Sequence, residues 1–338
     1  MDQAGDPGST SSRIAIATLA DDAVREWQAG AALQALEGGL LQSHAGRRPA
    51  TAWIDLTAPD EALVERVARL LGLHELIAED IIEGNQRSKI EATDGLVHIV
   101  LFALDFEAGV KAHEIDIVLG EGFLLTSHPA AWDPRAGSHF RAGLGPILKA
   151  GPDHVLWAVF DMIVDAYFPF ADRVEDEIDA IQDSVIGRAD RATLTRVFEL
   201  KRQLITVRRA VSPVREVLNQ LTNRDLELID AAEIIYFRDI YDHVIRLTDE
   251  LDNDRELVTT TLDVYLSQVN NNLSAIMKRL TGVTVILAGI GAIAGIFGMS
   301  EAGLAFSGGE AIGFWAVTVA TIAVAGLVAL VLRRIDWI

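Results

Sequence analysis

The side chains of this 338-residue chain that could do chemistry are mostly carboxylates. Glu79 and Asp80 are adjacent, and a dense acidic run, VEDEIDAIQD, occupies residues 174–183. Carboxylate oxygens are the ligands that hard cations such as Mg²⁺ and Ca²⁺ prefer. The pattern therefore indicates a capacity to bind cations. Solvated helix faces carry such acids too, and that interpretation stays open for both segments.

Several other kinds of active site are excluded by what the sequence lacks. The chain has no cysteine, which rules out disulfides, thiolate metal sites and cysteine catalysis. It contains no P-loop, GxSxG or HExxH motif, and its eight histidines are scattered without short metal-ligand spacing. A hydrolase that used paired carboxylates would still need a nucleophile and a base, and the sequence shows no such arrangement. We therefore expect no enzyme.

The overall charge favours cations over nucleic acids as partners. The chain has 29 basic and 49 acidic residues, and its formal net charge is −20. A surface of that sign repels phosphate backbones and concentrates cations. We expect divalent metal ions, and no nucleic acid, among the partners.

The apolar residues predict a membrane anchor at the C-terminal end. They make up 50% of the chain, and two runs of them, 280–299 and 312–332, contain no charged residue. Each run would be about 30 Å long as a helix, which is the thickness of a bilayer core. The sequence thus predicts two transmembrane helices, and two buried core helices are the alternative.

Basic residues flank the two runs on one side only. Lys278 and Arg279 precede the first run, and Arg333 and Arg334 follow the second, whereas the connecting residues 300–311 contain no lysine or arginine. By the positive-inside rule, both termini are cytoplasmic and residues 300–311 form an external loop. The expected location is the inner or plasma membrane.

The rest of the chain divides into two parts of different pattern. Strands are expected at 14–19, 52–56, 96–105 and 113–127, with an amphipathic helix ending near Leu71 between them. After Pro152 the pattern is helical and acidic. The predicted organisation is a disordered lead-in (1–12), a cytoplasmic α/β domain (13–150), a helical funnel and stalk (151–279), the two spans with their loop, and a cytoplasmic basic tail (333–338).

The longest predicted helix carries an apolar stripe. Leu247, Val258, Val269 and Leu280 are eleven residues apart, a repeat of about 3.67 residues per turn that runs nearly straight along a helix. No proline or glycine interrupts residues 243–280, and the pattern continues into the first apolar run. We predict one helix of about 55 residues. Its stripe must pack on preceding helices or on neighbouring chains.

Two spans per chain are too few to enclose an ion path, so an oligomer would have to supply one. The first span contains five glycines, and Gly291 and Gly295 have the spacing that allows close helix approach. They share one helix face with Thr284, Ala288 and Gly298. Two interpretations stay open for this face: it lines a pore, or it packs against another helix.

Several stretches along the chain are informative as a set: WIDL (53–56), HELIAEDIIEGNQRSKIE (74–91), GEGFLLTSH (120–128), VEDEIDAIQD (174–183), RRAVSPVREVL (208–218), YFRDIYDHVIRLTDEL (236–251), LDVYLSQVNNNLSAIMKRLT (262–281) and AGIFGM (294–299). No single stretch is specific, but their order, their spacing and the C-terminal double span are. Taken together, they resemble the CorA family of divalent metal-ion transporters, including its ZntB-type relatives, over nearly the whole chain.

The resemblance implies an α+β membrane protein that assembles as a homopentamer with an acidic helical funnel, a long stalk helix and two C-terminal transmembrane helices. It also implies regulatory metal sites between subunits, at Glu79, Asp80, Asp161 and Asp239. A divalent cation that bridged these carboxylates would offset their repulsion and hold the ring closed. Pairing of some of these acids with arginines such as Arg238 is the alternative.

The resemblance places the pore along the first span, and the chain departs from the family at the outer end. Where the family has Gly-Met-Asn, this chain has Gly298-Met299-Ser300, so one hydroxyl replaces an amide. Glu301 and Glu310 in the external loop would attract cations. The implied pore positions are Ser274, Met277, Leu280, Thr284, Ala288, Gly291, Gly295, Gly298, Met299 and Ser300.

The function implied is a transporter or channel for divalent cations, with Mg²⁺ and Co²⁺ uptake expected first and gating by cytoplasmic metal. A ZntB-type transporter of Zn²⁺, Ni²⁺ or Co²⁺, with or without proton coupling, is the alternative within the family. A membrane-anchored metal sensor that does not conduct is an alternative of another class, which Ser300 makes conceivable. The ion, the direction of transport and the driving force stay open.

Overall fold

The computed structural model describes residues 12–20, 23–41, 51–106, 109–187, 190–223, 226–299, 312–334 and Trp337. The chain forms two compact units, Met1–Ile181 with Thr195–Thr259 and Gln182–Leu194 with Thr260–Ile338. The predicted lead-in, except Ser12, and the predicted external loop with Ser300, Glu301 and Glu310 lie outside the described residues.

The first unit is built on a seven-stranded mixed sheet with the strand order β2-β1-β3-β7-β6-β5-β4. Only β3 and β7 are parallel, and all other neighbours are antiparallel. The strands are β1 (Arg13–Ala20), β2 (Ala23–Gln28), β3 (Ala52–Thr57), β4 (Lys89–Thr93), β5 (Leu96–Asp105), β6 (Lys111–Gly120) and β7 (Phe123–His128).

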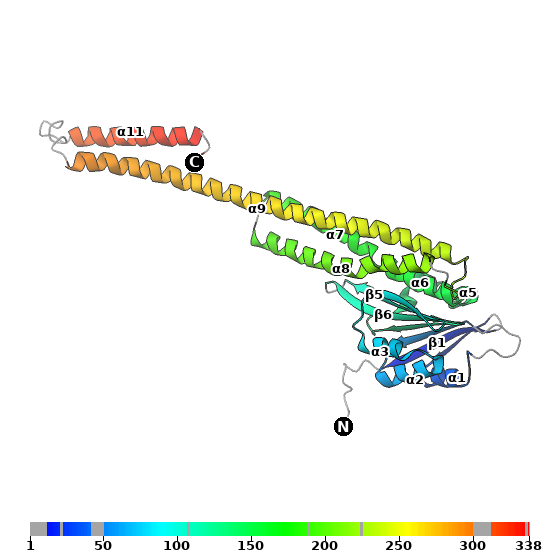
Figure 1. The fold of residues 1–338 in the computed structure, drawn as a ribbon. Coiled ribbons are helices and arrows are strands. Elements are labelled where there is room, and N and C mark those ends of the chain that lie inside the picture. Colours follow the sequence, from blue (N-terminus) through cyan, green and yellow to red (C-terminus); the bar gives the residue numbers. More distant parts are fainter. Residues whose placement is uncertain are drawn as a thin grey trace, which may run out of the picture. The chain divides into compact units, whose positions relative to one another are not determined.

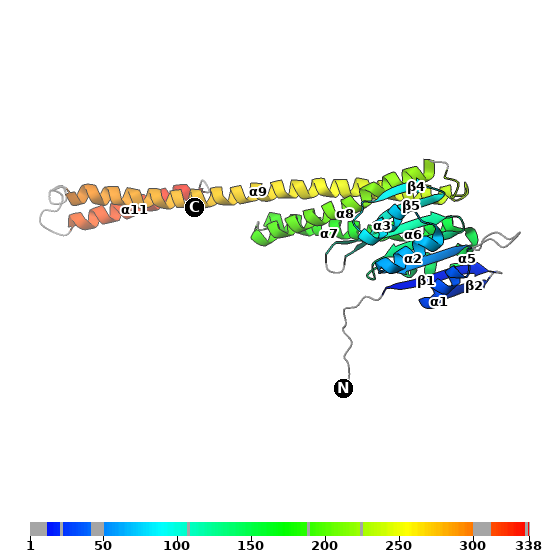
Figure 2. The same ribbon diagram turned by 60° about the horizontal axis from the view of Figure 1, so that its bottom comes forward.

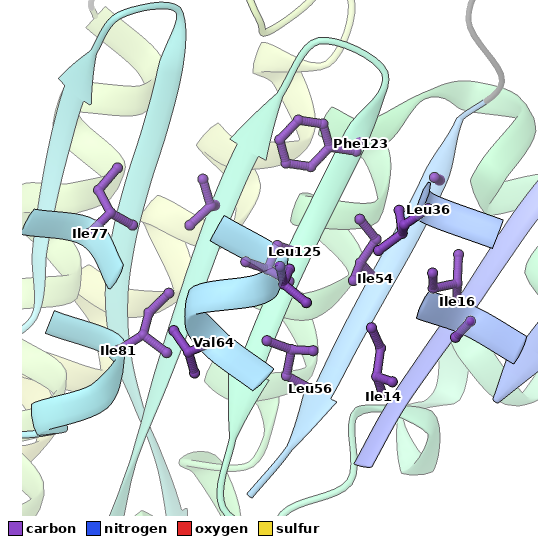
Figure 3. Packing of buried hydrophobic residues seen from close by; sticks show 14 of the residues in the cluster. Ile14, Ile16, Leu36, Ile54, Leu56, Val64, Ile77, Ile81, Phe123 and Leu125 are labelled. Carbon is purple, nitrogen blue, oxygen red and sulfur yellow. The ribbon is translucent and has the colours of Figure 1, made fainter. Parts of the chain in front are cut away.

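Helices cover both faces of this sheet (Figure 1). On one face lie α1 (Gly30–Glu37), α2 (Glu61–Leu71) and α3 (Glu75–Glu83), which enclose a core of aliphatic side chains from β1, β3 and β7 (Figure 3). On the other face, α6 (Pro152–Asp165) contacts β3, β5, β6 and β7. The short elements η1 (Pro134–Ala136), α4 (Ser138–Arg141) and α5 (Leu144–Ala150) precede it.

The ends of α2 and α3 follow from local capping. Asp60 accepts a hydrogen bond from the Leu63 N–H, and His74 Nδ1 accepts one from the Leu76 N–H, so each helix begins at a side-chain cap. Each ends at a glycine with positive φ, of which Gly84 (φ 55°) closes α3. The caps fix α3, and with it Asp80, directly before the β4–β5 hairpin.

Four long helices follow the sheet: α6, α7 (Phe168–Gly187), α8 (Arg191–Asn223) and α9 (Ile234–Met299). The predicted fusion of the stalk with the first apolar run is confirmed, because α9 is one helix of 66 residues that begins earlier than expected. The last helix, α11 (Ile312–Arg334), runs beside the C-terminal end of α9 (Figures 1 and 2). The helical pattern predicted after Pro152 begins with two helices, α6 and α7, separated by a turn at Ala166 and Tyr167.

The sheet departs from the sequence prediction in two ways. The strand expected at 113–127 is two strands, β6 and β7, because Glu121 and Gly122 form a tight turn between them. The elements β2, α1, α3 and β4 were not predicted. Most of β2 and β4 is exposed, so edge strands such as these lack the apolar alternation that identifies a half-buried strand.

Candidate metal sites and the pore helix

The first candidate group lies where α3 meets the β4–β5 hairpin. Asp80 on α3 receives a hydrogen bond from the Lys89 ammonium, whose Nζ is 2.7 Å from Oδ2. The same Nζ lies 3.1 Å from Oε2 of Glu91. One ammonium therefore pairs with two carboxylates, so Lys89, Asp80 and Glu91 together carry one formal negative charge.

A buried histidine completes this group from the sheet. The side chain of His98 on β5 is 1% exposed, and its Nε2 lies 3.0 Å from Oδ1 of Asp116 on β6. Its Nδ1 makes no hydrogen bond and lies 3.9 Å from Asp80 Oδ2. One ligand atom each of Asp80, Glu91 and His98 lies within 4.8 Å of the others. The group combines two carboxylates and one imidazole, which is a donor set for a divalent metal ion.

Glu114, two residues before Asp116 on β6, belongs to the same neighbourhood. Both of its carboxylate oxygens accept hydrogen bonds from the backbone N–H of Gln86, at 3.1 Å. Burial raises the pKa of Glu114 to about 7; the Gln86 hydrogen bond opposes this, and the nearby Asp116 and Asp80 add to it. Glu114 thus ties the segment after α3 to the sheet and is partly protonated at neutral pH.

The second candidate group lies between α4, α6 and α9. Oδ2 of Asp161 on α6 is 2.7 Å from Nε2 of His139 on α4, and Oδ2 of Asp239 on α9 is 4.0 Å from Nε2 of His243. Burial raises the pKa of Asp165, and so do Asp161 and Asp239, while His243 and His139 lower it. These mutual effects place three carboxylates and two imidazoles in one neighbourhood, but among the described residues only Asp80, Glu91 and His98 bring three ligand atoms within 4.8 Å of one another.

The four acids predicted as metal ligands are therefore not all together. Asp161 and Asp239 share the second group, whereas Asp80 belongs to the first, and α3 and α6 cover opposite faces of the sheet (Figure 1). Glu79 is exposed and has neither a hydrogen bond nor an ion pair among the described residues. The alternative, pairing with Arg238, does not occur among the described ion pairs, in which the basic partner of Asp80 is Lys89.

Sequence reasoning missed His98 and His139 because they lie far along the chain from Asp80 and Asp161. It missed His243 although that residue follows Asp239 by one helical turn. One local signal was present for His98. Asp94 and Gly95 have positive φ values (53° and 77°) and form the two-residue turn between β4 and β5. That turn places Glu91 directly opposite His98. No comparable local signal places Asp116, because its position depends on the register between β5 and β6.

The predicted pore positions from Ser274 to Gly295 all lie on α9 and are exposed in the single chain. At about 100° per residue, most of them share one side of the helix. This side, which we call the small-residue face, consists of Met277, Leu280, Thr284, Ala288, Gly291 and Gly295. The least exposed residues between 270 and 296 lie on the opposite side: Gly282, Ile286 and Ile293. For Gly298 and Met299 only the backbone is described, as part of α9.

Two described helical stretches are long and apolar enough to cross a membrane, Pro152–Ile186 and Ile234–Ile296. The most apolar part of the first is 56% buried, which is typical of a core helix, whereas that of the second is 6% buried. Helix α11 has no charged residue before Arg333, and its Trp315, Val319 and Leu327 are exposed. The end of α9 and α11 are thus the candidate spans, at the two predicted positions.

Comparisons with known proteins agree with this architecture. A model of the family described as "CorA-like Mg2+ transporter protein" matches residues 50–334. The cobalt/magnesium transport protein CorA of Thermotoga maritima is 34% identical over 255 residues, 73% of this chain and 72% of that protein. More distantly, the zinc transport protein ZntB of an Enterobacter species is 25% identical over 182 residues, 53% of this chain and 54% of that protein.

A solved structure shows the same fold. The complete structure of the CorA magnesium transporter from Methanocaldococcus jannaschii matches with a TM-score of 0.78, over 96% of this chain and 98% of that chain. The two sequences are 21% identical, so this match supports the arrangement of the elements and carries no argument about the ion.

Proposed function

The chain belongs to the CorA-like family of Mg²⁺ transporters, and from that membership we propose that it is a homopentameric divalent-cation transporter of a cell membrane, with Mg²⁺ and Co²⁺ as its principal ions. The observation that carries the proposal is the uncovered C-terminal half of α9. Leu273, Ile276 and Leu280 are 54%, 59% and 60% exposed. Apolar surface of this extent needs lipid and partner chains to cover it, and five copies of α9 around one axis would enclose a path.

The small-residue face of α9 would line that path. It carries no charge between Leu280 and Met299, so no side chain there can replace the strongly held water of Mg²⁺, and the ion would cross largely hydrated. The Thr284 hydroxyl donates to the Leu280 carbonyl at 2.8 Å, which leaves its oxygen lone pairs free to accept hydrogen bonds from the water of a passing ion. Ala288, Gly291 and Gly295 on the same face keep this part of the lumen wide enough for a hydrated cation.

We place the regulatory metal between subunits, at Glu79, Asp80, Asp161 and Asp239. Two features support this placement. Asp80 and Asp239 belong to groups on opposite faces of the sheet, so one chain alone does not bring them together. In addition, the Asp239 side chain is 72% exposed and is available to a neighbouring chain. Metal bound there would hold the ring closed, and its loss would release the repulsion between carboxylates.

We propose that both termini are cytoplasmic and that residues 300–311 are external, from the basic residues that flank the two spans. Cysteine substitution tests this topology, because the chain has no native cysteine. Ser307→Cys should react with a membrane-impermeant thiol reagent on intact cells, and Ser9→Cys should react only after permeabilisation. The reverse pattern would contradict the topology.

Ion uptake by the purified protein in liposomes tests the function itself. Mg²⁺, Co²⁺, Zn²⁺ and Ni²⁺ should be supplied one at a time, with and without a pH gradient, and empty liposomes serve as the control. We expect uptake of Mg²⁺ and Co²⁺ without a gradient. Uptake of Zn²⁺ alone that needs the gradient would assign the chain to the ZntB type. Metal binding without any uptake would identify a sensor.

A further inference from the structure

We propose that Asp80, Glu91 and His98 form a metal site within each subunit, selective for borderline transition metals such as Zn²⁺ and Co²⁺ over Mg²⁺. The three residues come from α3, β4 and β5, and their ligand atoms already lie within 4.8 Å of one another. Zinc ligands at about 2.0–2.2 Å in a tetrahedral arrangement are about 3.4 Å apart. The side chains therefore need to close by at most about 1.4 Å, and water would occupy the fourth position.

The imidazole distinguishes this group from an ordinary acidic cluster. His98 is almost completely buried, and its Nε2 faces the Asp116 carboxylate at 3.0 Å. A carboxylate accepts hydrogen bonds, so Nε2 carries the hydrogen and Nδ1 presents its lone pair. That Nδ1 has no hydrogen-bond partner and points toward Asp80. A ligating histidine whose second nitrogen is held by a carboxylate is the usual arrangement around zinc.

Lys89 marks the place where this cluster stabilises a cation. Its Nζ contacts both Asp80 and Glu91, and it offsets one of their two negative charges, whereas a divalent ion would offset both. The Lys89 side chain is 25% exposed and flexible, so it can swing into solvent when metal binds. Glu91, with 56% of its side chain exposed, opens the site to solvent. The Lys89 ammonium thus competes with the metal for the two carboxylates and keeps the metal affinity moderate.

Selectivity follows from the mixed donor set. Imidazole nitrogen suits Zn²⁺, Co²⁺ and Ni²⁺, whereas Mg²⁺ requires octahedral oxygen ligands and releases its water reluctantly. One consequence rests on the function proposed above. Asp80 would be shared with the site between subunits, so a transition metal bound within one chain would withdraw Asp80 from a bridge to the neighbouring chain. The transporter would then sense two kinds of metal through one carboxylate.

Zinc titration calorimetry on the full-length protein in detergent tests the site directly. The titration is run in about 20 mM Mg²⁺, a large excess that fills oxygen-only sites. It is run in a His139→Gln/Asp239→Asn/His243→Gln background, because that change removes both imidazoles of the second group and the carboxylate proposed to bridge subunits. We expect one Zn²⁺ per chain. Glu91→Gln, a change at an exposed position, should weaken the affinity at least about tenfold, as should His98→Phe. Lys89→Met should tighten it several-fold.

Three results would overturn the site: equal Zn²⁺ affinity with and without Glu91→Gln, an unchanged or weaker affinity in Lys89→Met, or full competition by Mg²⁺. As a second readout, Co²⁺ bound to four or five ligands that include nitrogen gives a visible absorption band, and this band should be lost in His98→Phe while circular dichroism stays native. Binding is measured without transport, so the outcome does not depend on whether the liposome uptake succeeds.

Discussion

The two halves of α9 carry the same kind of apolar stripe but have different surroundings. In the N-terminal half, Phe237, Val244, Leu247 and Leu251 are at most 1% exposed. The Phe237 ring packs edge-on against Phe160 of α6, with centroids 6.1 Å apart. In the C-terminal half the stripe continues through Leu273, Ile276 and Leu280, and more than half of each side chain is exposed.

The difference shows what a periodic pattern can and cannot determine. Spacing of three and four residues identifies the apolar face of a helix, whatever covers it. In the first half, the chain's own helices cover the face, and Arg208 of α8 holds Asp252 of α9 by a forked ion pair with Nε–Oδ1 at 2.6 Å. In the second half, nothing among the described residues covers the stripe. That half is the part of the molecule for which we propose neighbouring chains and lipid.

The largest expected effect comes from truncating the buried half of the stripe. Phe237→Ala should destabilise the first unit by about 3–5 kcal/mol, because it removes a fully buried ring and leaves a cavity. Leu273→Ala, at an exposed stripe position, should change the free energy of unfolding by less than about 0.5 kcal/mol while lowering the fraction of assembled oligomer. Urea unfolding and size-exclusion light scattering of the detergent-solubilised protein measure the two quantities. Equal losses of stability in both variants would contradict the conclusion that the chain itself covers only the N-terminal half of the stripe.

A second prediction concerns the small-residue face of the exposed half. Beyond the backbone of its own helix and its two chain neighbours, no atom among the described residues lies within 4 Å of the position that a Cβ would occupy on Gly291 or Gly295, so we expect leucine there to leave the single subunit undisturbed. In the proposed pentamer, Gly291→Leu or Gly295→Leu should reduce ion flux at least about tenfold, because five added side chains would meet at the axis. The matched change Ala323→Leu, at an exposed position of α11, should be mild in the same liposome assay. Similar ion flux in all three variants would show that the small-residue face does not line the pore.

The third prediction tests the acidic side of the buried half, which faces away from the stripe. If a divalent cation links Asp80 of one chain to Asp239 of the next, Mg²⁺ at ten times its dissociation constant should stabilise the closed assembly by about 1.4 kcal/mol. For a chain of this size, that corresponds to a rise of about 2–3 °C in the thermal midpoint. Asp80→Asn combined with Asp239→Asn should abolish most of the rise and leave the proposed pentamer intact.

Glu91→Gln is the control for this experiment. It removes a ligand of the proposed intra-subunit zinc site but leaves Asp80 and Asp239, the two ligands of the proposed bridge between chains, unchanged. Its Mg²⁺-dependent rise in the thermal midpoint should be that of the unchanged protein. If the double variant also keeps the full rise, the regulatory metal lies elsewhere, and Glu79 and Asp161 are the next positions to change.

Much of the fold was predictable because it rests on local patterns. The stalk helix, its fusion with the first span and the second span follow from apolar period and length. The strands β3 and β5 follow from their buried apolar runs. The edge strands β2 and β4 were missed because their side chains are mostly exposed. Apolar and polar residues alternate along a strand only where one of its faces is buried.

The candidate sites were less predictable than the fold. The acids Asp80 and Asp239 were selected through a family resemblance, and nothing local to either residue indicates its partner. The neighbours that decide their chemistry, Lys89 and His98 for the first and His243 for the second, arise from a hairpin register and from one helical turn. The one-turn spacing of Asp239 and His243 was visible in the sequence, but the spacing alone could not show which acids of α6 they face.

The smallest expected effect comes from a charge inside the buried half of α9. Asp254 is 5% exposed, and its Oδ2 has no hydrogen-bond partner. Burial, and then Glu250 and Glu175, raise its pKa from 3.8 to about 6. The folded state therefore holds this proton more tightly than the unfolded state does, so stability should fall as pH rises from about 4 to about 6 and stay lower at pH 7.

Asp254→Asn should remove that loss and stabilise the protein by about 1 kcal/mol at pH 7. Thermal midpoints between pH 4.5 and 7.5, measured in a chelator so that no divalent cation masks the carboxylate, give the slope. The exposed Asp249→Asn should keep the slope of the unchanged protein. If Asp254→Asn instead lowers the midpoint at pH 7, a favourable contact stabilises the charged carboxylate. Burial of this charge would then not destabilise the N-terminal half of α9.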